Sequence, residues 1–311
     1  MALAILFHTS KMLASRWLAA FQRLDPDLDI RTPTALGDPA EIDVAVSWRL
    51  PPGTFSQLPN LKLMQCTGAG VDQLLIDPEL PADLPVARMV DPLQADEMVA
   101  FAIWAVVDQH REMAFYRSEV VARRWTFRPQ QSMRNRCVGV LGLGSMGGVL
   151  AARLALLGFD VAGWSRGEKT IAGVTCYHGD QGLAGLLARA QILVNLLPLT
   201  AVTRGILNSR LFAQLPPGAM VINLGRGPHL IEADLLSALD QGHLASALLD
   251  VFSVEPLPDD HPFWGHPKIT ITPHIASLAD PDHAAPQVIE NIRRVRAGLP
   301  ALNLVDRSAG Y

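Results

Sequence analysis

The sequence predicts an α/β protein with two doubly wound parallel-sheet domains and a cleft between them. Short apolar runs of strand length alternate with segments of helical periodicity along most of the 311 residues. In mid-chain, an apolar run from Cys137 to Leu141 leads through three spaced glycines into an Ala- and Leu-rich segment. Such alternation is typical of parallel sheets covered by helices on both faces. The length is also sufficient for two domains.

The residues before the glycine-rich turn predict the first domain. Strands are expected at Leu3 to Phe7, Val44 to Trp48 and Leu61 to Gln65, and helices at Ser15 to Leu24 and Gln94 to about Tyr116. The second of these helices leads the chain into the glycine-rich strand. A last helix, about His283 to Ala297, follows all the strands of the second domain. We expect it to return to the first domain, so that the chain crosses between domains twice.

A Gly-x-Gly-x-x-Gly turn follows the strand that ends at Leu141. The first glycine allows a tight turn, the second lets a pyrophosphate approach the backbone, and the third lets the next helix pack closely on the strand. The N-terminus of that helix offers N–H groups and its dipole to the phosphates. A purely structural strand–helix turn is the alternative. The expected dinucleotide contacts in this turn are Gly142, Leu143, Gly144, Ser145, Met146 and Gly147.

The second half of the chain continues the alternation. Further strands are expected at Asp160 to Trp164, Ile192 to Leu196, Ala219 to Asn223, Ala247 to Val251 and Ile269 to Ile271. Helices lie between them, for example at Glu232 to Gln241. We therefore expect a Rossmann-type dinucleotide domain over residues 99–276. Residues 1–98 and 277–311 are expected to form a flavodoxin-like domain for the substrate.

The end of the strand at Asp160 to Trp164 indicates which dinucleotide binds. Sites for NAD usually carry an Asp or Glu about 20 residues into the motif, bonded to the ribose 2′-hydroxyl. This chain has Ser165 and Arg166 there, with Lys169 close behind. A hydroxyl and a guanidinium would bind the 2′-phosphate that a carboxylate would repel. We expect NADP(H) in preference to NAD(H); the alternative is that these are solvated loop charges, with Glu168 between them.

Composition excludes several classes of function. With 18% charged residues and a net charge of −4, there is no reason to expect nucleic acid or an anionic membrane as a partner. Three cysteines do not suit a disulfide framework and favour a reducing compartment. No apolar run approaches the ~18 residues of a membrane span. We expect a cytoplasmic protein, and we expect no metal at the histidines of the Pro-rich loop, His261 and His266.

Three later segments each carry a charged or titratable residue at a strand end. They are Val221-Ile-Asn-Leu-Gly-Arg226, Leu249-Asp250-Val-Phe-Ser-Val-Glu255-Pro256 and Ile271-Thr-Pro-His274. Together with the glycine motif and the turn Gly68-Ala-Gly70-Val-Asp72, they resemble the D-isomer-specific 2-hydroxyacid dehydrogenase family, in the family's order. The Trp164-Ser165-Arg166 segment and the short C-terminus are most similar to its glyoxylate/hydroxypyruvate reductase A branch.

The resemblance implies a catalytic role for three residues. Hydride that arrives at a 2-oxo carbon leaves an alkoxide, which needs a proton. His274 suits this role, because an imidazole with an ordinary pKa of about 6.5 is partly protonated near neutrality. Glu255 on the other ring nitrogen would favour the imidazolium. Arg226 would bind the substrate carboxylate with its planar fork and polarise the keto oxygen. Taken singly, they could instead be a core histidine, a turn and a surface charge.

The resemblance also implies further contacts with the ligands. Asp250 would lie near the nicotinamide carboxamide, and backbone N–H groups around Ala69 and Gly70 would hold the substrate carboxylate. Trp48 is expected either to line the substrate pocket or to pack in the core. Met98 stands where family members often have an aromatic residue or His, which leaves the choice of 2-oxoacid open. The remaining expected cofactor contacts are Leu197, Pro198, Thr203, Leu224 and Gly225.

The sequence thus predicts an NADPH-preferring reductase that converts small 2-oxoacids, such as glyoxylate and hydroxypyruvate, to D-2-hydroxyacids. One alternative is an NAD-linked dehydrogenase of a larger hydroxyacid. Another is a dinucleotide-sensing corepressor that acts through protein contacts; the intact set of Arg226, Glu255 and His274 favours an enzyme. We also expect a homodimer in which residues from Phe115 to Phe127 form an arm that pairs two nucleotide domains.

Exchanging the residues at the ribose site should remove the preference for NADPH. In a Ser165→Asp, Arg166→Ala double variant, Asp repels the 2′-phosphate and the phosphate loses its strongest partner. Loss of a charged hydrogen bond of ~1.5–3 kcal/mol should weaken NADPH by roughly one to two orders of magnitude, mainly through KM. The measurement is kcat/KM with NADPH and NADH in both proteins. A native preference for NADH, or an unchanged ratio, would contradict the assignment of Arg166.

Overall fold

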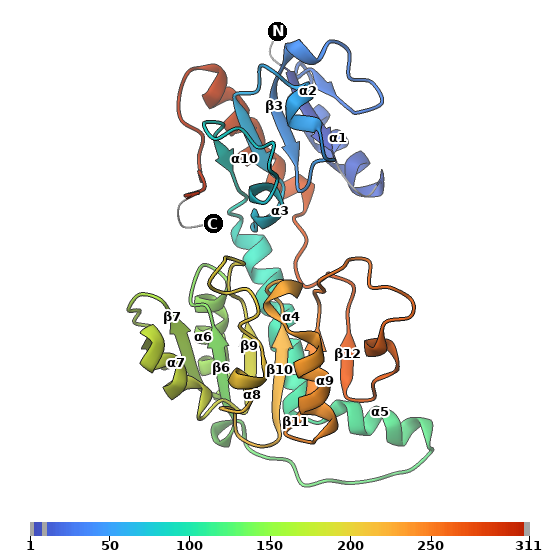
Figure 1. Ribbon diagram of the computed structural model, residues 1–311, viewed down its shortest axis with the longest axis vertical. Helices are drawn as coiled ribbons and strands as arrows, with labels where there is room; N and C mark the ends of the chain where they lie inside the picture. Colours follow the sequence, from blue (N-terminus) through green and yellow to red (C-terminus); the bar gives the residue numbers. More distant parts are fainter. Residues whose placement is uncertain (1–2, 8–10, 308–311) are drawn as a thin grey trace. The chain divides into compact units, whose positions relative to one another are not determined.

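The computed structural model describes residues 3–7 and 11–307. The chain forms two compact units (Figure 1). Unit 1 comprises Met1–Gln94 and Leu278–Tyr311, and unit 2 comprises Ala95–Ser277. The sequence prediction put the two crossings between residues 98 and 99 and between residues 276 and 277.

Unit 1 is built on a five-stranded parallel sheet in the order β2-β1-β3-β4-β5. This is the flavodoxin-like order, in which the second strand lies outside the first and the others follow on the opposite side. The predicted flavodoxin-like sheet is therefore confirmed. Its strands are β1 (Leu3–Phe7), β2 (Ile30–Arg31), β3 (Ile42–Ser47), β4 (Leu63–Cys66) and β5 (Val86–Ala87).

The helix expected near the C-terminus packs within unit 1. This helix, α10 (Pro281–Arg296), lies against α1 (Lys11–Leu24), and their apolar faces share one core cluster that includes Trp17 and Val288. Asn291 of α10 is fully buried and donates to Gln65 Oε1 of β4 at 2.7 Å. The shorter helices of unit 1 are η1 (Pro39–Glu41), α2 (Thr54–Gln57) and α3 (Asp72–Leu75).

Unit 2 is built on a seven-stranded parallel sheet in the order β12-β11-β10-β9-β6-β7-β8. The chain builds outward from β6 to β8 and then continues on the other side of β6 with β9. This is the Rossmann-type order, and its topological switch point lies between β6 and β9. The predicted Rossmann-type sheet is confirmed. Its strands are β6 (Cys137–Leu141), β7 (Asp160–Ser165), β8 (Val174–His178), β9 (Ile192–Asn195), β10 (Ala219–Asn223), β11 (Leu244–Leu249) and β12 (Ile269–Ile271).

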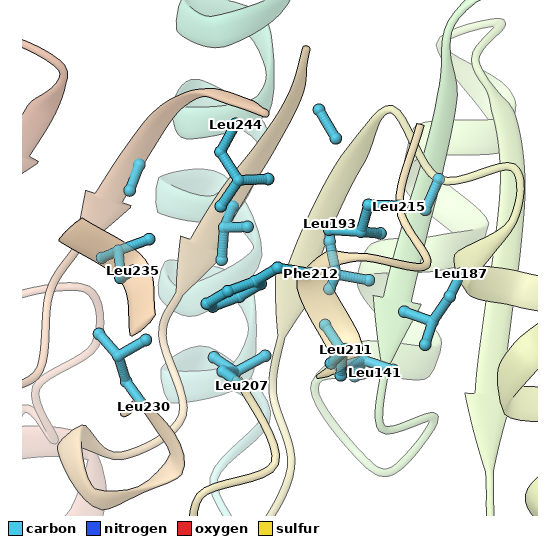
Figure 2. Packing of buried hydrophobic residues seen from close by; sticks show 14 of the residues in the cluster. Leu141, Leu187, Leu193, Leu207, Leu211, Phe212, Leu215, Leu230, Leu235 and Leu244 are labelled. Atoms are coloured by element: carbon cyan, nitrogen blue, oxygen red, sulfur yellow. The ribbon is translucent and has the colours of Figure 1, made fainter. Parts of the chain in front are cut away.

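Helices cover both faces of this sheet. Alternate residues of β6 point to opposite faces, so that Val138 and Val140 join one core cluster and Leu141 joins another. In the second cluster, Phe212 lies among leucines from several strands and helices (Figure 2). Helix α4 (Pro92–His110) begins in unit 1 and continues into unit 2. The other helices of unit 2 are α5 (Met113–Val121), η2 (Met133–Asn135), α6 (Gly147–Leu156), α7 (Gly179–Leu187), α8 (Ser209–Phe212), η3 (Gly227–His229), α9 (Glu232–Asp240) and η4 (Pro262–Gly265).

Several elements differ from the sequence prediction, among them the two-residue strands β2 and β5, which it did not include. The single helix expected from Gln94 to about Tyr116 is wrong, because α4 ends at His110 and α5 is a separate helix. Between them, Glu112 takes a left-handed backbone with φ 54°, which breaks the helical path. The edge strand β8 was not predicted; its residues are only partly buried and include Thr175 and His178, so no apolar run marks it.

None of the helices within residues 3–7 and 11–307 has the length and apolar character that a membrane crossing requires.

Candidate active site

The glycine-rich turn joins β6 to α6 with almost no space for side chains at two of its three glycines. Gly142 has φ 95°, and a Cβ there would lie 2.9 Å from the Leu196 carbonyl oxygen at the end of the neighbouring β9. A Cβ on Gly147 would lie 1.8 Å from the Gly142 carbonyl oxygen. By contrast, a Cβ on Gly144 would meet no described atom within 4 Å. The turn thus has a tight start, an open middle and a close helix–strand contact, as a pyrophosphate cradle requires.

The end of β7 presents the residues expected at the ribose. Ser165 is partly buried, whereas Arg166 and Lys169 are exposed in the loop that follows. The Ser165 hydroxyl donates to the Gly167 carbonyl oxygen at 2.8 Å. A bond from this hydroxyl to a 2′-phosphate would therefore require the side chain to turn away from Gly167. Both basic side chains lie at the surface of the loop after β7.

The loop after β9 is tied together by side-chain hydrogen bonds. The Leu197 N–H donates to Asn195 Oδ1 at 3.2 Å. Further along, the Thr203 hydroxyl donates to the Pro198 carbonyl oxygen at 2.7 Å. Leu197 is buried and Pro198 is exposed. This loop follows the strand next to β6, so it lies at the switch point of the sheet, where such folds bind ligands.

Arg226 follows β10 and is the residue before η3. Leu224 and Gly225 before it are buried, while Arg226 is partly exposed. One guanidinium nitrogen donates to the Gly225 carbonyl oxygen at 2.9 Å. This bond folds the side chain back over its own turn and uses one of the five N–H groups of the guanidinium.

His274 and Glu255 form a pair. His274 Nδ1 lies 2.8 Å from Glu255 Oε2, and each side chain is 29% exposed. The other carboxylate oxygen, Oε1, accepts from the Phe252 N–H at 2.9 Å. Burial raises the pKa of Glu255, but the hydrogen bonds from His274 and Phe252 and the nearby positive charges outweigh it, so the net pKa lies below its usual value. The carboxylate therefore stays ionised beside the imidazole near neutrality.

Asp250, directly after β11, holds the loop that carries His274. It is 1% exposed. Its Oδ1 accepts from the Thr272 hydroxyl at 2.7 Å and from the Ile275 N–H at 2.9 Å. Its Oδ2 accepts from the Ala276 N–H at 3.0 Å. Asp250 thus binds the Thr272 side chain before His274 and the backbone after it. His274 itself has a left-handed φ of 53°.

Comparison with known proteins agrees with this geometry. The family model described as D-isomer specific 2-hydroxyacid dehydrogenase, NAD binding domain, matches residues 103–276. A glyoxylate/hydroxypyruvate reductase A of Serratia proteamaculans is 40% identical over 312 residues, 99% of each chain. The chain belongs to the D-isomer specific 2-hydroxyacid dehydrogenase family. The resemblance inferred from the motifs is therefore confirmed.

Two solved structures of this family are similar over almost their whole length. A 2-hydroxyacid dehydrogenase from Xanthobacter autotrophicus, in complex with NADPH and MES, has a TM-score of 0.92 and 43% identity, and the match covers 99% of each chain. An NADPH-dependent glyoxylate/hydroxypyruvate reductase from Sinorhizobium meliloti, in complex with NADP and sulfate, has a TM-score of 0.94 and 36% identity, with 100% of each chain covered.

The structure brings together only some of the predicted residues of this 2-hydroxyacid dehydrogenase. Glu255, His274 and the buried Asp250 share one pair of loops in unit 2. Trp48, Ala69 and Gly70 belong to unit 1 and are partly exposed there. Within unit 1, Trp48 lies against the turn, because a Cβ on Gly68 would come 3.0 Å from its Cδ1. Their contacts with a substrate stay predictions.

Met98 and the two histidines of the Pro-rich loop make structural contacts in unit 2. Met98 is 9% exposed and lies in a core cluster of unit 2. The histidines of the Pro-rich loop bind carboxylates, His261 to Glu232 at 3.2 Å and His266 to Asp240 at 3.3 Å. Within residues 3–7 and 11–307 there is no group of three or more His, Cys, Asp or Glu residues arranged to hold a metal ion.

Three buried polar residues beside the site were not predicted from the sequence. Asn195 and Asn223 are the last residues of β9 and β10, and His229 follows Arg226 in η3; each is 0% exposed. The asparagines leave a signal in the sequence, because each is a single polar residue at the end of an apolar run, where the next turn needs hydrogen-bond partners. His229 leaves none.

Removing the charge of Glu255 should shift the pH dependence of reduction. If His274 donates the proton, reduction requires the imidazolium, and its rate should fall at high pH. The lowered pKa of Glu255 shows that its ionised form is favoured beside His274. A Glu255→Gln variant loses this charge and with it the stabilisation of the imidazolium, so the high-pH limb should move to lower pH. The measurement is kcat/KM for the oxoacid against pH.

Glu232→Gln is the matched control for this variant. It removes a carboxylate that also binds a histidine in unit 2, His261, outside the proposed site. The control should leave the pH profile unchanged. An unchanged pH profile in Glu255→Gln, or equal shifts of the profile in both variants, would show that Glu255 does not control the protonation of His274.

Proposed function

We propose that the protein is an NADPH-dependent reductase that converts small 2-oxoacids, with glyoxylate and hydroxypyruvate foremost, to D-2-hydroxyacids. The pairing of His274 with the ionised Glu255, at the carboxyl edge of a Rossmann-type sheet, carries the proposal. Related proteins support it: the Serratia relative is named a glyoxylate/hydroxypyruvate reductase, and the Xanthobacter structure contains NADPH.

The dinucleotide fits the residues at the switch point. The tight turn with an open middle at Gly144 would hold the pyrophosphate, and Arg166 and Lys169 would take a 2′-phosphate. The loop at Leu197 and Pro198 would flank the cofactor from the next strand. When bound, the nicotinamide would supply the hydride for the keto carbon. The Rossmann-type order and the glycine geometry thus agree with the cofactor that the sequence predicts.

His274 would act as the general acid. Its Nδ1 faces Glu255, so the proton for the substrate must come from Nε2. As the keto carbon gains the hydride, the carbonyl electron pair moves to oxygen, and His274 donates its Nε2 proton there. The ring becomes neutral and is protonated again from solvent. Glu255 favours the charged ring before the transfer and fixes which nitrogen faces the substrate.

Arg226 would hold the substrate. A planar guanidinium meets a carboxylate through two parallel N–H···O bonds, and a further N–H can polarise the keto oxygen. The bond to the Gly225 carbonyl limits the freedom of the side chain, so less entropy is lost on binding. Within unit 2, Arg226 and His274 would then act on the two ends of the same small oxoacid.

We also propose a cytoplasmic homodimer. In unit 2, α5 projects beyond the sheet and the segment after it runs back to β6 (Figure 1). The two expose large apolar side chains: Val120 at 76%, Val121 at 86%, Trp125 at 103% and Phe127 at 81%. Exposed apolar clusters of this kind mark interaction surfaces, and a second copy of the chain would cover them. All three cysteines are free thiols, which supports a reducing compartment.

Steady-state assays of the native protein test the proposed activity. NADPH and NADH oxidation would be followed with glyoxylate, hydroxypyruvate and larger 2-oxoacids, and the configuration of the product from hydroxypyruvate determined. The proposal predicts the highest kcat/KM for NADPH with the small oxoacids and a D product. Preference for NADH with a larger substrate would favour the NAD-linked dehydrogenase. Tight NADPH binding without turnover of any oxoacid would favour the sensor protein.

Replacing Arg226 by Lys should be costly although the charge is kept. A point charge cannot replace the planar fork, so KM for the oxoacid should rise and kcat should fall. Loss of one charged hydrogen bond of ~1.5–3 kcal/mol corresponds to roughly 10- to 150-fold in kcat/KM, while NADPH affinity should change little. Arg210→Lys on the exposed start of α8 is the control and should have no effect. Near-native kcat/KM in Arg226→Lys would contradict the role of Arg226.

A further inference from the structure

Three fully buried polar side chains lie together at the carboxyl edge of β9 and β10. Asn195 and Asn223 end these neighbouring strands and are register partners, and His229 is the last residue of η3. All three are 0% exposed. Because an unpaired buried polar group is costly, each needs hydrogen-bond partners. We call these three residues the strand-end network.

The hydrogen bonds of His229 determine its tautomer. Its Nδ1 lies 3.0 Å from the Arg226 backbone nitrogen and 3.0 Å from Asn195 Nδ2. The Arg226 N–H can only donate, so Nδ1 must be the acceptor. On the other side of the ring, Nε2 lies 3.2 Å from the Pro198 carbonyl oxygen, which can only accept. The ring is therefore neutral, with its proton on Nε2.

The two asparagines complete the network. Asn195 donates to Asn223 Oδ1 at 2.9 Å, and its own Oδ1 accepts from the Leu197 N–H. Asn223 in turn donates to the Arg226 carbonyl oxygen at 3.1 Å. The network thus binds both backbone polar groups of Arg226. It also binds the backbone of the loop at Leu197 and Pro198.

We propose that His229 is a positioning residue that holds these two segments through its two ring nitrogens. Through Nδ1 it fixes the backbone of Arg226, and through Nε2–H it fixes Pro198 in the loop after β9. This rests on the proposed function, which assigns Arg226 to the oxoacid and Pro198 to the cofactor. One ring then supports substrate affinity through one nitrogen and cofactor affinity through the other.

A role in capping η3 alone does not explain the arrangement. The bond from the Arg226 N–H to Nδ1 belongs to a capping box, which needs only that one nitrogen. The bond from Nε2 instead reaches a residue 31 positions earlier in the chain. Gly225 also fits the network closely, because a Cβ there would lie 2.8 Å from Asn195 Nδ2 and 2.9 Å from His229 Nδ1. The absence of a side chain at Gly225 therefore leaves room for the hydrogen bond between Asn195 and His229.

Two variants each remove the hydrogen bond of one ring nitrogen of His229. Asn in place of His229 keeps an acceptor near the position of Nδ1 but cannot reach Pro198. Gln keeps a donor near the position of Nε2 but loses the acceptor for the Arg226 N–H. We expect His229→Gln to raise KM for the oxoacid about tenfold with NADPH affinity retained, and His229→Asn to weaken NADPH about tenfold with oxoacid KM retained. Thermal unfolding of both variants shows whether they stay folded.

The readouts distinguish this proposal from the proposed function. NADPH affinity is measured by fluorescence titration without an oxoacid, so it does not depend on turnover. If the native protein binds NADPH but reduces no oxoacid, the proposed function fails. The effect of His229→Asn on NADPH affinity can still be measured in that case, because it does not depend on turnover. If the native protein is active and each variant loses both affinities to the same extent, or loses neither, the proposal is overturned.

A measurement on the native protein covers the case in which the variants do not fold. In ¹⁵N-labelled protein, the ring nitrogens of His229 should give the signals of the neutral Nε2–H tautomer, with Nδ1 as a hydrogen-bonded acceptor. A proton on Nδ1 would overturn the proposal, because the Arg226 N–H would then face another donor.

Discussion

Buried backbone groups in the turns that follow parallel strands must find hydrogen-bond partners outside the sheet, and this constraint shapes the site. In unit 2, buried side chains at the strand ends meet it: Asn195 at the end of β9, Asn223 at the end of β10 and Asp250 directly after β11. Because these side chains accept from and donate to the turn backbone, they fix the loops that carry Arg226 and His274. The side chains of Arg226 and His274 can then remain partly exposed while these hydrogen bonds hold the backbone around them.

The sheet order places the residues proposed for the dinucleotide and those proposed for the oxoacid on opposite sides of the switch point. On the side of β6 and β7 lie the glycine-rich turn and the Ser165 loop, which provide N–H groups and basic side chains for a dinucleotide. On the side of β9 to β12 lie Arg226, Glu255 and His274, to which the proposed function assigns the binding of the substrate carboxylate and the donation of the proton. Because all strands are parallel, these turns lie along one edge of the sheet.

Much of this could be predicted from the sequence, because it depends on local patterns. Apolar runs gave the main strands, the glycine spacing gave the β6–α6 turn, and titratable residues at strand ends marked the site. What depends on tertiary contacts could not be predicted. The break at Glu112 lacks a Gly or Pro, and β8 is an edge strand with mixed residues. His229 is one of 9 histidines, and only its buried partners on Pro198 and Arg226 distinguish it.

Amide hydrogen exchange around His274 tests most directly whether strand-end side chains hold the catalytic loops. An Asp250→Asn variant puts an NH₂ group where one carboxylate oxygen accepts from Thr272, Ile275 or Ala276. At least one of the Ile275 and Ala276 amides should then exchange about tenfold faster or more, relative to the amides of β10. Thr272→Val, which keeps both amide bonds, should leave their exchange unchanged. Unchanged exchange in Asp250→Asn would contradict the account.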